Sequence, residues 1–376
     1  MNRSEEYRVS KMKIGVNIQV DNSSIGTARL QEAVFENWLP FTEISGKNQL
    51  EIYAFCFGYR FSRPKHLPLC IKYKKSILPG KIQRLANQSW NIPIEKILGL
   101  PKLDAILDLR MDNFQSSAPV VSYVPDVAWK YYGTGEYEKV FPLKCIRRAE
   151  KSIESSAKII TLSKWSKAEI GKFFPETLSK IDVIYCGVDS DFQPELDCKH
   201  SIEIPKLIIP KNYFLMMGSI NARKNPRILG DALKKIGPGF NMVHVGSAPC
   251  EGYAFWNLDF PEIFPVGFVP KNVLASLLKN AKFLIIPSTC EGFGIPLIEG
   301  MASKVPVLCS DIPVFREISQ NTVKYFKPNC PIDLANQILD IWNFPDPEMV
   351  SKAFLRSKEF NWKVAADSYL NILKSV

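Results

Sequence analysis

Two glutamates separated by seven residues carry the clearest chemical signal in this sequence. Glu291 lies in a glycine-containing stretch, residues 291–294, after an apolar strand pattern, and Glu299 lies in the next helical pattern. Pro296 falls near the first turn of that helix, where proline is well tolerated. Glycines let the backbone approach a ligand closely, and a helix start offers free N–H groups and a positive dipole end, which suit phosphate. A carboxylate suits sugar hydroxyl groups instead, so these residues predict a ligand that carries both groups.

Two adjacent cations form the second candidate site. Arg223 and Lys224 follow Gly218, which ends another apolar strand pattern, and they precede a helical pattern. We expect Asn225 to cap this helix and Pro226 to be its first residue. Two cations at a helix start would neutralise a diphosphate leaving group, so this site predicts that no metal ion is needed.

The elements that position these residues follow a regular alternation of strand and helix patterns. The alternation predicts an α/β fold of two facing, doubly wound, Rossmann-like domains, each with a parallel sheet. The pattern lapses over residues 189–210, which we expect to be the linker. We therefore expect an N-terminal domain over 1–193, a C-terminal domain over 205–355, and a C-terminal helix over 356–376 that packs back on the N-terminal domain. Ligands of such sheets bind beyond the carboxyl ends of the strands, so the cleft between the domains is the expected site.

The expected strands are residues 13–20, 50–57, 104–109, 120–124, 158–162 and 181–186 in the first half, and 213–217, 242–245, 265–268, 282–286, 306–308 and 323–326 in the second. The clearest helical patterns are residues 27–38, 142–155 and 226–235.

Composition narrows the class of protein. The 376 residues are 46% hydrophobic and 23% charged, which is typical of a globular protein and excludes a disordered one. The net charge of +10 favours anionic partners, whether nucleic acid, acidic lipid or phosphorylated small molecules. Nine cysteines without a CxxC pair predict reduced thiols and no zinc cluster. The first residues lack the apolar stretch of a signal peptide, and no apolar run approaches the roughly 18–20 residues of a membrane span. A cytoplasmic protein is therefore expected, with any membrane contact limited to the inner surface.

The two candidate sites together resemble those of the retaining glycosyltransferases of family 4, whose GT-B architecture has two facing Rossmann-like domains. The similarity rests on the EGFGxPxxE motif over residues 291–299 and on the Arg-Lys pair after Gly218. Two further segments match, Val-Gly-Phe-Val at 266–269 and Phe-Asn-Trp at 360–362. The resemblance covers the whole chain and is much stronger in its second half.

This resemblance implies a retaining, metal-independent transferase that uses no cofactor. It would move a hexose-type sugar from a nucleotide-diphosphate donor to a saccharide, glycolipid or glycoprotein acceptor in polysaccharide biosynthesis. Glu299 would bind the donor ribose, and Val269 would contact the base through its backbone. The departing phosphate would accept the acceptor's proton on the same face of the sugar, so the protein mainly supplies positioning and charge stabilisation. The implied catalytic residues are Glu291 and Asp126, and the implied donor-binding residues are Gly26, Ser219, Arg223, Lys224, Val269, Phe293, Gly294, Ile295 and Glu299.

One position departs from the family pattern. Many relatives have a His-Asp pair at the end of a middle strand of the first domain, and this chain has Pro125 followed by Asp126. Asp126 is either a turn residue or a ligand of the sugar. The missing histidine leaves open a non-catalytic relative that binds a partner, whereas the retained glutamates and cations oppose that alternative.

A basic stretch in the first half has no role in the family motifs. Residues 60–94 contain eight Lys or Arg and no Asp or Glu. This stretch is either a solvated face or a surface for anionic lipid or a phosphate-bearing acceptor. Nucleic acid is not expected, because no nucleic-acid-binding motif accompanies the charge. The candidate contact residues are Lys72, Lys74, Lys75 and Lys81. Asp104, Asp108 and Asp112, farther along, are interpreted as a strand end and turn rather than a metal site.

Overall fold

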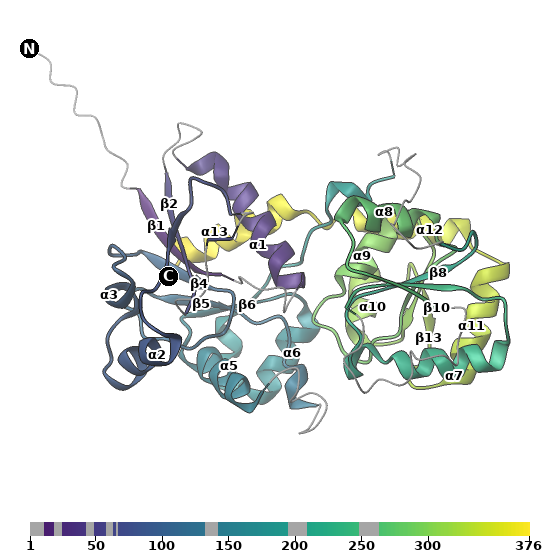
Figure 1. Ribbon diagram of the computed structural model, residues 1–376, viewed down its shortest axis with the longest axis horizontal. Helices are drawn as coiled ribbons and strands as arrows, with labels where there is room; N and C mark the ends of the chain where they lie inside the picture. The colour runs from purple at the N-terminus through teal and green to yellow at the C-terminus, as the bar shows by residue number, and fades with distance from the viewer. Residues whose placement is uncertain are drawn as a thin grey trace, which may run out of the picture.

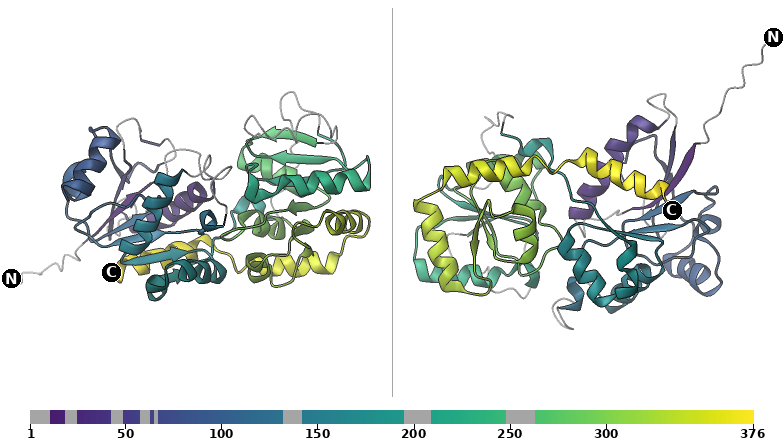
Figure 2. Two further views of the ribbon diagram at one scale, coloured as in Figure 1. Left: turned by 90° about the horizontal axis from the view of Figure 1, so that it is seen from below. Right: turned by 180° about the vertical axis from the view of Figure 1, so that it is seen from behind.

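Two α/β domains lie side by side in the computed structural model (Figures 1 and 2). The structure describes residues 11–18, 25–42, 49–57, 63–64, 67–131, 142–194, 209–247 and 263–376. Each domain has one parallel sheet with helices on both faces, so the predicted fold class is confirmed. No helix in these described ranges combines the length and the apolar character needed to cross a bilayer.

The first domain contains a seven-stranded sheet in the order β3-β2-β1-β4-β5-β6-β7. Helices α1 and α13 cover one face, and α5 and α6 cover the other. The central strands β4, β5 and β6 are almost completely buried, as expected of a parallel sheet covered on both faces. The strands are β1 (Met12–Asn17), β2 (Leu50–Phe55), β3 (Lys72–Lys74), β4 (Ala105–Asp108), β5 (Val120–Tyr123), β6 (Lys158–Thr161) and β7 (Ile181–Val183). The helices are α1 (Ile25–Trp38), η1 (Leu39–Phe41), α2 (Gly80–Ser89), α3 (Ile94–Leu98), η3 (Ala128–Lys130), α5 (Leu143–Ser155), α6 (Lys164–Phe173), η4 (Pro175–Lys180) and α13 (Trp362–Lys374).

The second domain repeats this scheme with a six-stranded sheet in the order β10-β9-β8-β11-β12-β13. Helices α8 and α9 pack on one face, and α7 and α11 pack on the other. The strands are β8 (Phe214–Met217), β9 (Met242–Val245), β10 (Ile263–Gly267), β11 (Leu284–Ile286), β12 (Val307–Ser310) and β13 (Lys324–Phe326). The helices are η5 (Ser190–Phe192), η6 (Ala222–Lys224), α7 (Pro226–Ile236), α8 (Lys271–Asn280), α9 (Ile295–Ala302), α10 (Pro313–Ser319), α11 (Pro331–Asn343) and α12 (Pro347–Ser357).

One strand in the first sheet was not expected. β3 lies at the sheet edge and pairs with β2 in parallel register. Its sequence, Lys-Tyr-Lys, is short and mostly polar, so it carries no apolar strand pattern. Charged side chains are typical of such edges, where they oppose pairing with other chains.

The chain passes between the domains twice, and the two crossings touch each other. The first follows β7, and the second joins α12 to α13, which returns to the first domain and packs on α1 (Figure 1). At the contact, Trp362 Nε1 donates to Asp189 Oδ1 at 2.8 Å, and the Val188 N–H donates to the Phe360 carbonyl at 3.2 Å. A Cβ atom on Gly187 would lie 2.2 Å from the Trp362 nitrogen, so only glycine fits there. Of the expected linker, residues 195–208 lie outside the described ranges.

Candidate functional site

Glu299 lies one turn inside α9 and is almost completely buried, with 2% of its surface exposed. Its Oε1 accepts a hydrogen bond from the guanidinium of Arg29 in α1, an ion pair that crosses between the domains. Its Oε2 is buried and has no hydrogen-bond partner among the residues that the structure describes. Because an unpaired buried oxygen is costly, Oε2 is suited to accept a hydroxyl group of a bound ligand.

Glu291 is held by the two predicted cations. Lys224 Nζ donates to its Oε1 at 2.6 Å, and Arg223 Nη1 donates to its Oε2 at 2.9 Å. Burial alone would raise the pKa of Glu291, but the two cations outweigh it and lower the pKa to about 2. The carboxylate therefore stays ionised near neutral pH and cannot donate a proton there.

The cations lie on the turn η6, which joins β8 to α7. The side chain of Asn221 caps this turn, because its Oδ1 accepts from the Lys224 N–H at 3.1 Å. Asn225 occupies the N-cap position of α7, as expected, but it has a left-handed backbone with φ of 47° and its side chain makes no capping hydrogen bond. Its backbone instead reverses the chain between η6 and α7, which begins at Pro226 as expected.

The glycine stretch that contains Glu291 presses against the first domain. The Gly292 carbonyl accepts from the hydroxyl groups of Ser163 at 2.8 Å and Ser166 at 3.1 Å, near the start of α6. A Cβ atom on Gly292 would lie 2.3 Å from the Pro125 carbonyl oxygen, so only glycine permits this approach. Pro125, which stands where many relatives have a histidine, is therefore in direct contact with the second domain.

Asp126 has one of the two roles that the sequence left open, that of a turn residue, and it also lies close to Arg223. Its Oδ1 accepts from the Ala128 N–H at 3.0 Å, as a turn residue does. Its Oδ2 lies 3.5 Å from Nη1 of Arg223, which also binds Glu291. Arg223 therefore joins a carboxylate of each domain.

All the predicted catalytic and donor-binding residues line one cavity of about 360 Å³ between the domains. Carboxylates, the three cations Arg29, Arg223 and Lys224, and the start of α9 face this cavity together, so it fits a ligand with both hydroxyl and diphosphate groups. The individual roles stay predictions. The lining includes Gly26, Asp126, Ser219, Arg223, Lys224, Val269, Glu291, Phe293, Gly294, Ile295 and Glu299.

The predicted basic contact residues do not line this cavity. Lys72, Lys74 and Lys75 lie at or next to the edge strand β3, and Lys81 lies on α2, which Figure 1 places at the end of the first domain far from the second. Lys72 forms an ion pair with Glu51, so its charge is balanced.

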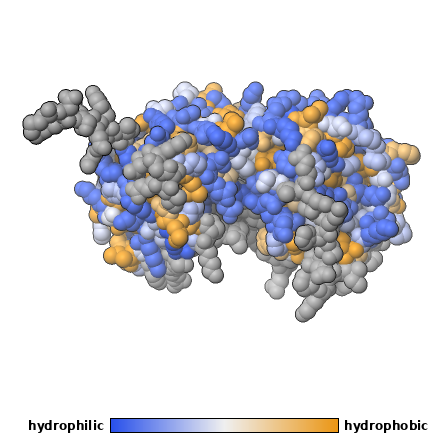
Figure 3. Space-filling model, turned by 90° about the horizontal axis from the view of Figure 1, so that it is seen from above, coloured by the Kyte–Doolittle hydropathy of each residue, from blue (hydrophilic) through white to orange (hydrophobic). Residues whose placement is uncertain are grey.

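Large apolar side chains are exposed beside these lysines. They occur over residues 67–90, on either side of and within α2, and we call them together with Lys72, Lys74, Lys75 and Lys81 the basic–apolar face. Such exposure is unusual, and the upper face of the molecule shows mostly hydrophilic residues with apolar ones in small groups (Figure 3). The exposed fractions are 92% for Leu69, 90% for Ile77, 47% for Ile82, 49% for Leu85 and 63% for Trp90.

The aspartates after β4 form a buried cluster away from the donor cavity. Asp108 ends β4 and is fully buried, and its pKa is raised to about 6 by burial and by the neighbouring charge of Asp112. Asp112 is itself paired with Arg84, Arg110 and Arg148. This arrangement agrees with the interpretation as a strand end and turn.

Arg29 and Glu317 are among the residues that connect the domains and were not predicted. Arg29 lies three positions after Gly26 on α1 and so on the same helix face, a spacing that could have indicated it. Glu317, on α10, accepts from the N–H groups of Lys164 at 2.7 Å and Trp165 at 2.8 Å, which begin α6 in the other domain. The sequence around Glu317 contains no motif that predicts this contact.

Sequence comparison finds mannosyltransferases among the relatives. The chain is 30% identical to the O-antigen chain mannosyltransferase RfbU of Salmonella typhimurium over 229 residues, 59% of this chain and 61% of that protein. It is 31% identical to the serotype-specific mannosyltransferase WbdA of Escherichia coli over 178 residues, 43% of this chain and 21% of that protein. The chain thus spans less than two thirds of the length of these curated relatives.

Solved structures share the fold over almost the whole chain. The sucrose-phosphate synthase from Thermosynechococcus elongatus has a TM-score of 0.72 at 16% identity, covering 97% of this chain and 99% of that one. WaaG, a glycosyltransferase involved in lipopolysaccharide biosynthesis, has a TM-score of 0.70 at 12% identity, covering 96% and 99%. These likenesses confirm the GT-B fold. In sequence, residues 201–352 match the family model of the glycosyl transferases group 1.

Proposed function

We propose that this protein is a retaining glycosyltransferase of family 4 that moves a hexose-type sugar from a nucleotide-diphosphate donor to a saccharide, glycolipid or glycoprotein acceptor. One observation carries the proposal: a single cavity between the two domains brings together Glu299, with an unpartnered buried oxygen, and Glu291, with its two cations. The match of residues 201–352 to the glycosyl transferases group 1 supports it.

The donor would lie along the second domain. The ribose hydroxyl groups would bond to Oε2 of Glu299, while Arg29 keeps the other oxygen. The diphosphate would lie at the start of α9 and near Arg223 and Lys224, where helix N–H groups and cations favour negative charge. The sugar would then lie near Glu291 and Asp126.

The reaction breaks the bond between the anomeric carbon and the donor phosphate oxygen and forms a bond from that carbon to an acceptor hydroxyl oxygen. The hydroxyl proton passes to the departing phosphate oxygen, on the same face, which gives retention. Glu291 does not serve as the acid, because its pKa lies at about 2. We infer that it orients the sugar and keeps Arg223 and Lys224 in place to stabilise the leaving group.

Mannose is the first donor sugar to test, because the two curated relatives described above are mannosyltransferases. A thermal-shift series with GDP-mannose, UDP-glucose and UDP-GlcNAc tests donor binding, since a ligand at 100 times its Kd adds about 2.7 kcal/mol to the free energy of unfolding. Release of nucleotide diphosphate without acceptor then tests catalysis. Binding without hydrolysis or transfer would favour the non-catalytic alternative, which the proline at position 125 supports. Stabilisation by none of a full set of sugar nucleotides would contradict the proposed transferase and leave the partner-binding alternative.

Metal independence is part of the proposal. Arg223 and Lys224 supply the positive charge that a divalent cation supplies in other transferases. Transfer should therefore persist in excess EDTA. Loss of transfer in EDTA, restored by magnesium or manganese, would show that these cations do not act on the leaving group.

A further inference from the structure

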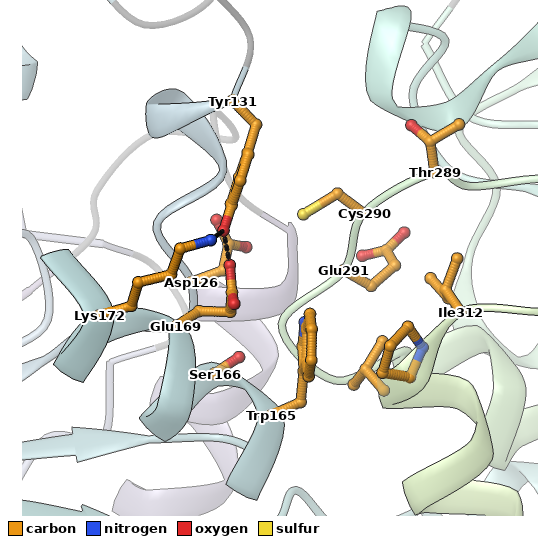
Figure 4. Close-up of a pocket in the computed structure, with 12 residues that line it drawn as sticks. Asp126, Tyr131, Trp165, Ser166, Glu169, Lys172, Thr289, Cys290, Glu291 and Ile312 are labelled. Carbon is orange, nitrogen blue, oxygen red and sulfur yellow. Dashed lines mark hydrogen bonds between the residues drawn. The ribbon is translucent and has the colours of Figure 1, made fainter.

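A second cavity, of about 410 Å³ (Figure 4), shares lining residues with the donor cavity. We propose that it binds an uncharged saccharide unit of the acceptor. This inference rests on the proposed glycosyltransferase function and concerns the other substrate.

The position of this cavity suits an acceptor. It shares Asp126 and Glu291 with the donor cavity, so the two spaces meet where the donor sugar would lie. A hydroxyl group that enters from the second cavity therefore meets the sugar end of the donor rather than its base. Its size falls within the roughly 300–1,000 Å³ of small-molecule sites.

Both domains supply the walls. The first domain contributes Tyr131 and one side of α6, and the second contributes residues 289–291 and 312–314. Trp165 forms an aromatic wall, and Ile312, Pro313 and Val314 add an apolar one. A sugar ring has an apolar C–H face that can pack on an aromatic ring, while its hydroxyl groups point to the rim.

The polar part of the cavity is already organised. The Tyr131 hydroxyl donates to Glu169, and Lys172 Nζ donates to the same hydroxyl at 3.2 Å (Figure 4). A carboxylate has about four lone-pair positions, and Tyr131 uses one, so Glu169 can accept further hydroxyl groups. Because these three side chains hold one another, little side-chain entropy is lost when a saccharide binds.

The charge of the lining selects against a phosphate at this position. The lining contains three carboxylates, Asp126, Glu169 and Glu291, and one ammonium group, Lys172. Arg223 and Lys224 pair with two of these carboxylates but do not line this cavity, so a ligand in it faces the carboxylates and not those cations. A phosphorylated sugar would bring a further negative charge among them, whereas a neutral sugar brings only hydroxyl groups. A neutral saccharide is therefore the ligand class that this cavity fits.

The test measures binding of neutral methyl glycosides by saturation-transfer NMR in the presence of GDP. The probes are the methyl α-glycosides of mannose, glucose, galactose and N-acetylglucosamine, with mannose 6-phosphate as the charged analogue. We expect the parent to bind at least one neutral glycoside and to prefer it to mannose 6-phosphate. Trp165→Ala should raise the Kd at least ten-fold, Trp165→Phe should restore much of the loss, and Glu169→Gln should raise the Kd about five-fold. Glu176→Gln, an exposed carboxylate outside the cavity, is the matched control and should bind as the parent does.

A transfer assay separates this inference from the proposed function. With GDP-mannose, Trp165→Ala should lower the ratio of transfer to hydrolysis at least ten-fold. Equal Kd values in the parent and Trp165→Ala, tighter binding of mannose 6-phosphate, or no glycoside binding by the parent would each overturn the acceptor cavity. Failure of the parent to hydrolyse any sugar nucleotide would instead overturn the function, whatever the glycosides do.

Discussion

At the scale of single residues, the donor cavity is held by ion pairs between side chains far apart in the sequence. Arg29 and Glu299 are separated by 270 positions, and Arg223 reaches both Asp126 and Glu291. The sequence predicted Glu299, Glu291 and the two cations because their local motifs reveal a loop and a helix start. It did not predict Arg29, since that contact depends on how the two domains face each other.

Glu299→Gln tests the donor site. The substitution keeps the shape of the side chain and removes the charge, which weakens hydrogen bonds to ribose worth about 1.5–3 kcal/mol. We expect the Kd of the nucleotide donor, measured by titration calorimetry, to rise about 10- to 100-fold. Glu348→Gln, on the exposed surface of α12, should leave the Kd unchanged. A parent-like Kd in Glu299→Gln would show that Glu299 is only a partner of Arg29.

Asp108 predicts a pH dependence of stability. Its folded-state pKa of about 6 lies above the ordinary value of 3.8, so the folded protein binds an extra proton between these values. The extra proton stabilises the folded protein, and this contribution to the free energy of unfolding is fully present below pH 3.8. It is lost, by up to about 3 kcal/mol, as the pH rises through 6. Asp108→Asn cannot titrate, so its Tm should improve relative to that of the parent between pH 5 and pH 7. A constant Tm difference over this range would contradict the raised pKa.

At the scale of elements, one helix start joins the two domains. The first N–H groups of α6 donate to the carboxylate of Glu317 on α10, which also accepts from the Tyr185 hydroxyl at 2.8 Å. A helix start attracts negative charge, so this carboxylate acts as a cap supplied by the other domain. The sequence could predict α6 from its own N-cap, Ser163, but not the second cap, because nothing local to α10 indicates it. β3 was not predicted either, because it is defined by its pairing with β2 at the sheet edge and not by an apolar pattern in its own sequence.

Glu317→Gln should loosen the closed arrangement of the domains. The amide loses the charge that favours the helix start, and charge-assisted bonds are worth about 1.5–3 kcal/mol. We expect a larger radius of gyration by small-angle scattering without ligand, partly reversed by the donor nucleotide, and a lower kcat. Asp367→Asn, in an exposed pair on α13, should scatter as the parent does. Identical scattering curves for the parent and Glu317→Gln would mean that the cap does not hold the domains together.

At the scale of the whole molecule, binding and anchoring features lie in different places. Both cavities lie between the domains, whereas the basic–apolar face lies at the far end of the first domain (Figure 1). The sequence indicated the lysines of this face but could not show which apolar side chains are exposed beside them. We propose that the face contacts an anionic membrane surface, because cations around exposed apolar side chains suit a headgroup interface.

Substitution of Lys72, Lys74, Lys75 and Lys81 by glutamine tests this surface. Each lysine near an anionic membrane contributes about 1 kcal/mol, although Lys72 should contribute less because Glu51 balances it. We expect the variant to lose binding to phosphatidylglycerol liposomes and to show a higher KM for a lipid-linked acceptor, with donor hydrolysis nearly unchanged.

A matched variant controls for net charge. Substitution of Lys234, Lys235, Lys352 and Lys374, which are exposed elsewhere on the molecule, removes the same charge and should leave liposome binding intact. A second variant, Ile77→Ser with Ile82→Ser, should weaken binding without changing the charge. If the parent does not bind liposomes and the lysine variant transfers normally, the face is only a solvated surface.

The two touching chain crossings have a mechanical consequence. Because Gly187 lies against Trp362 and the crossings are joined by hydrogen bonds, they behave as one joint rather than two independent tethers. We expect a single joint of this kind to favour rotation of the domains about one axis. Both cavities lie between the domains, so we expect one rotation of the domains to open both cavities to solvent. Spent nucleotide and lengthened saccharide would then leave during the same movement, and a spin-label pair across the cleft should report one opening distance, not two.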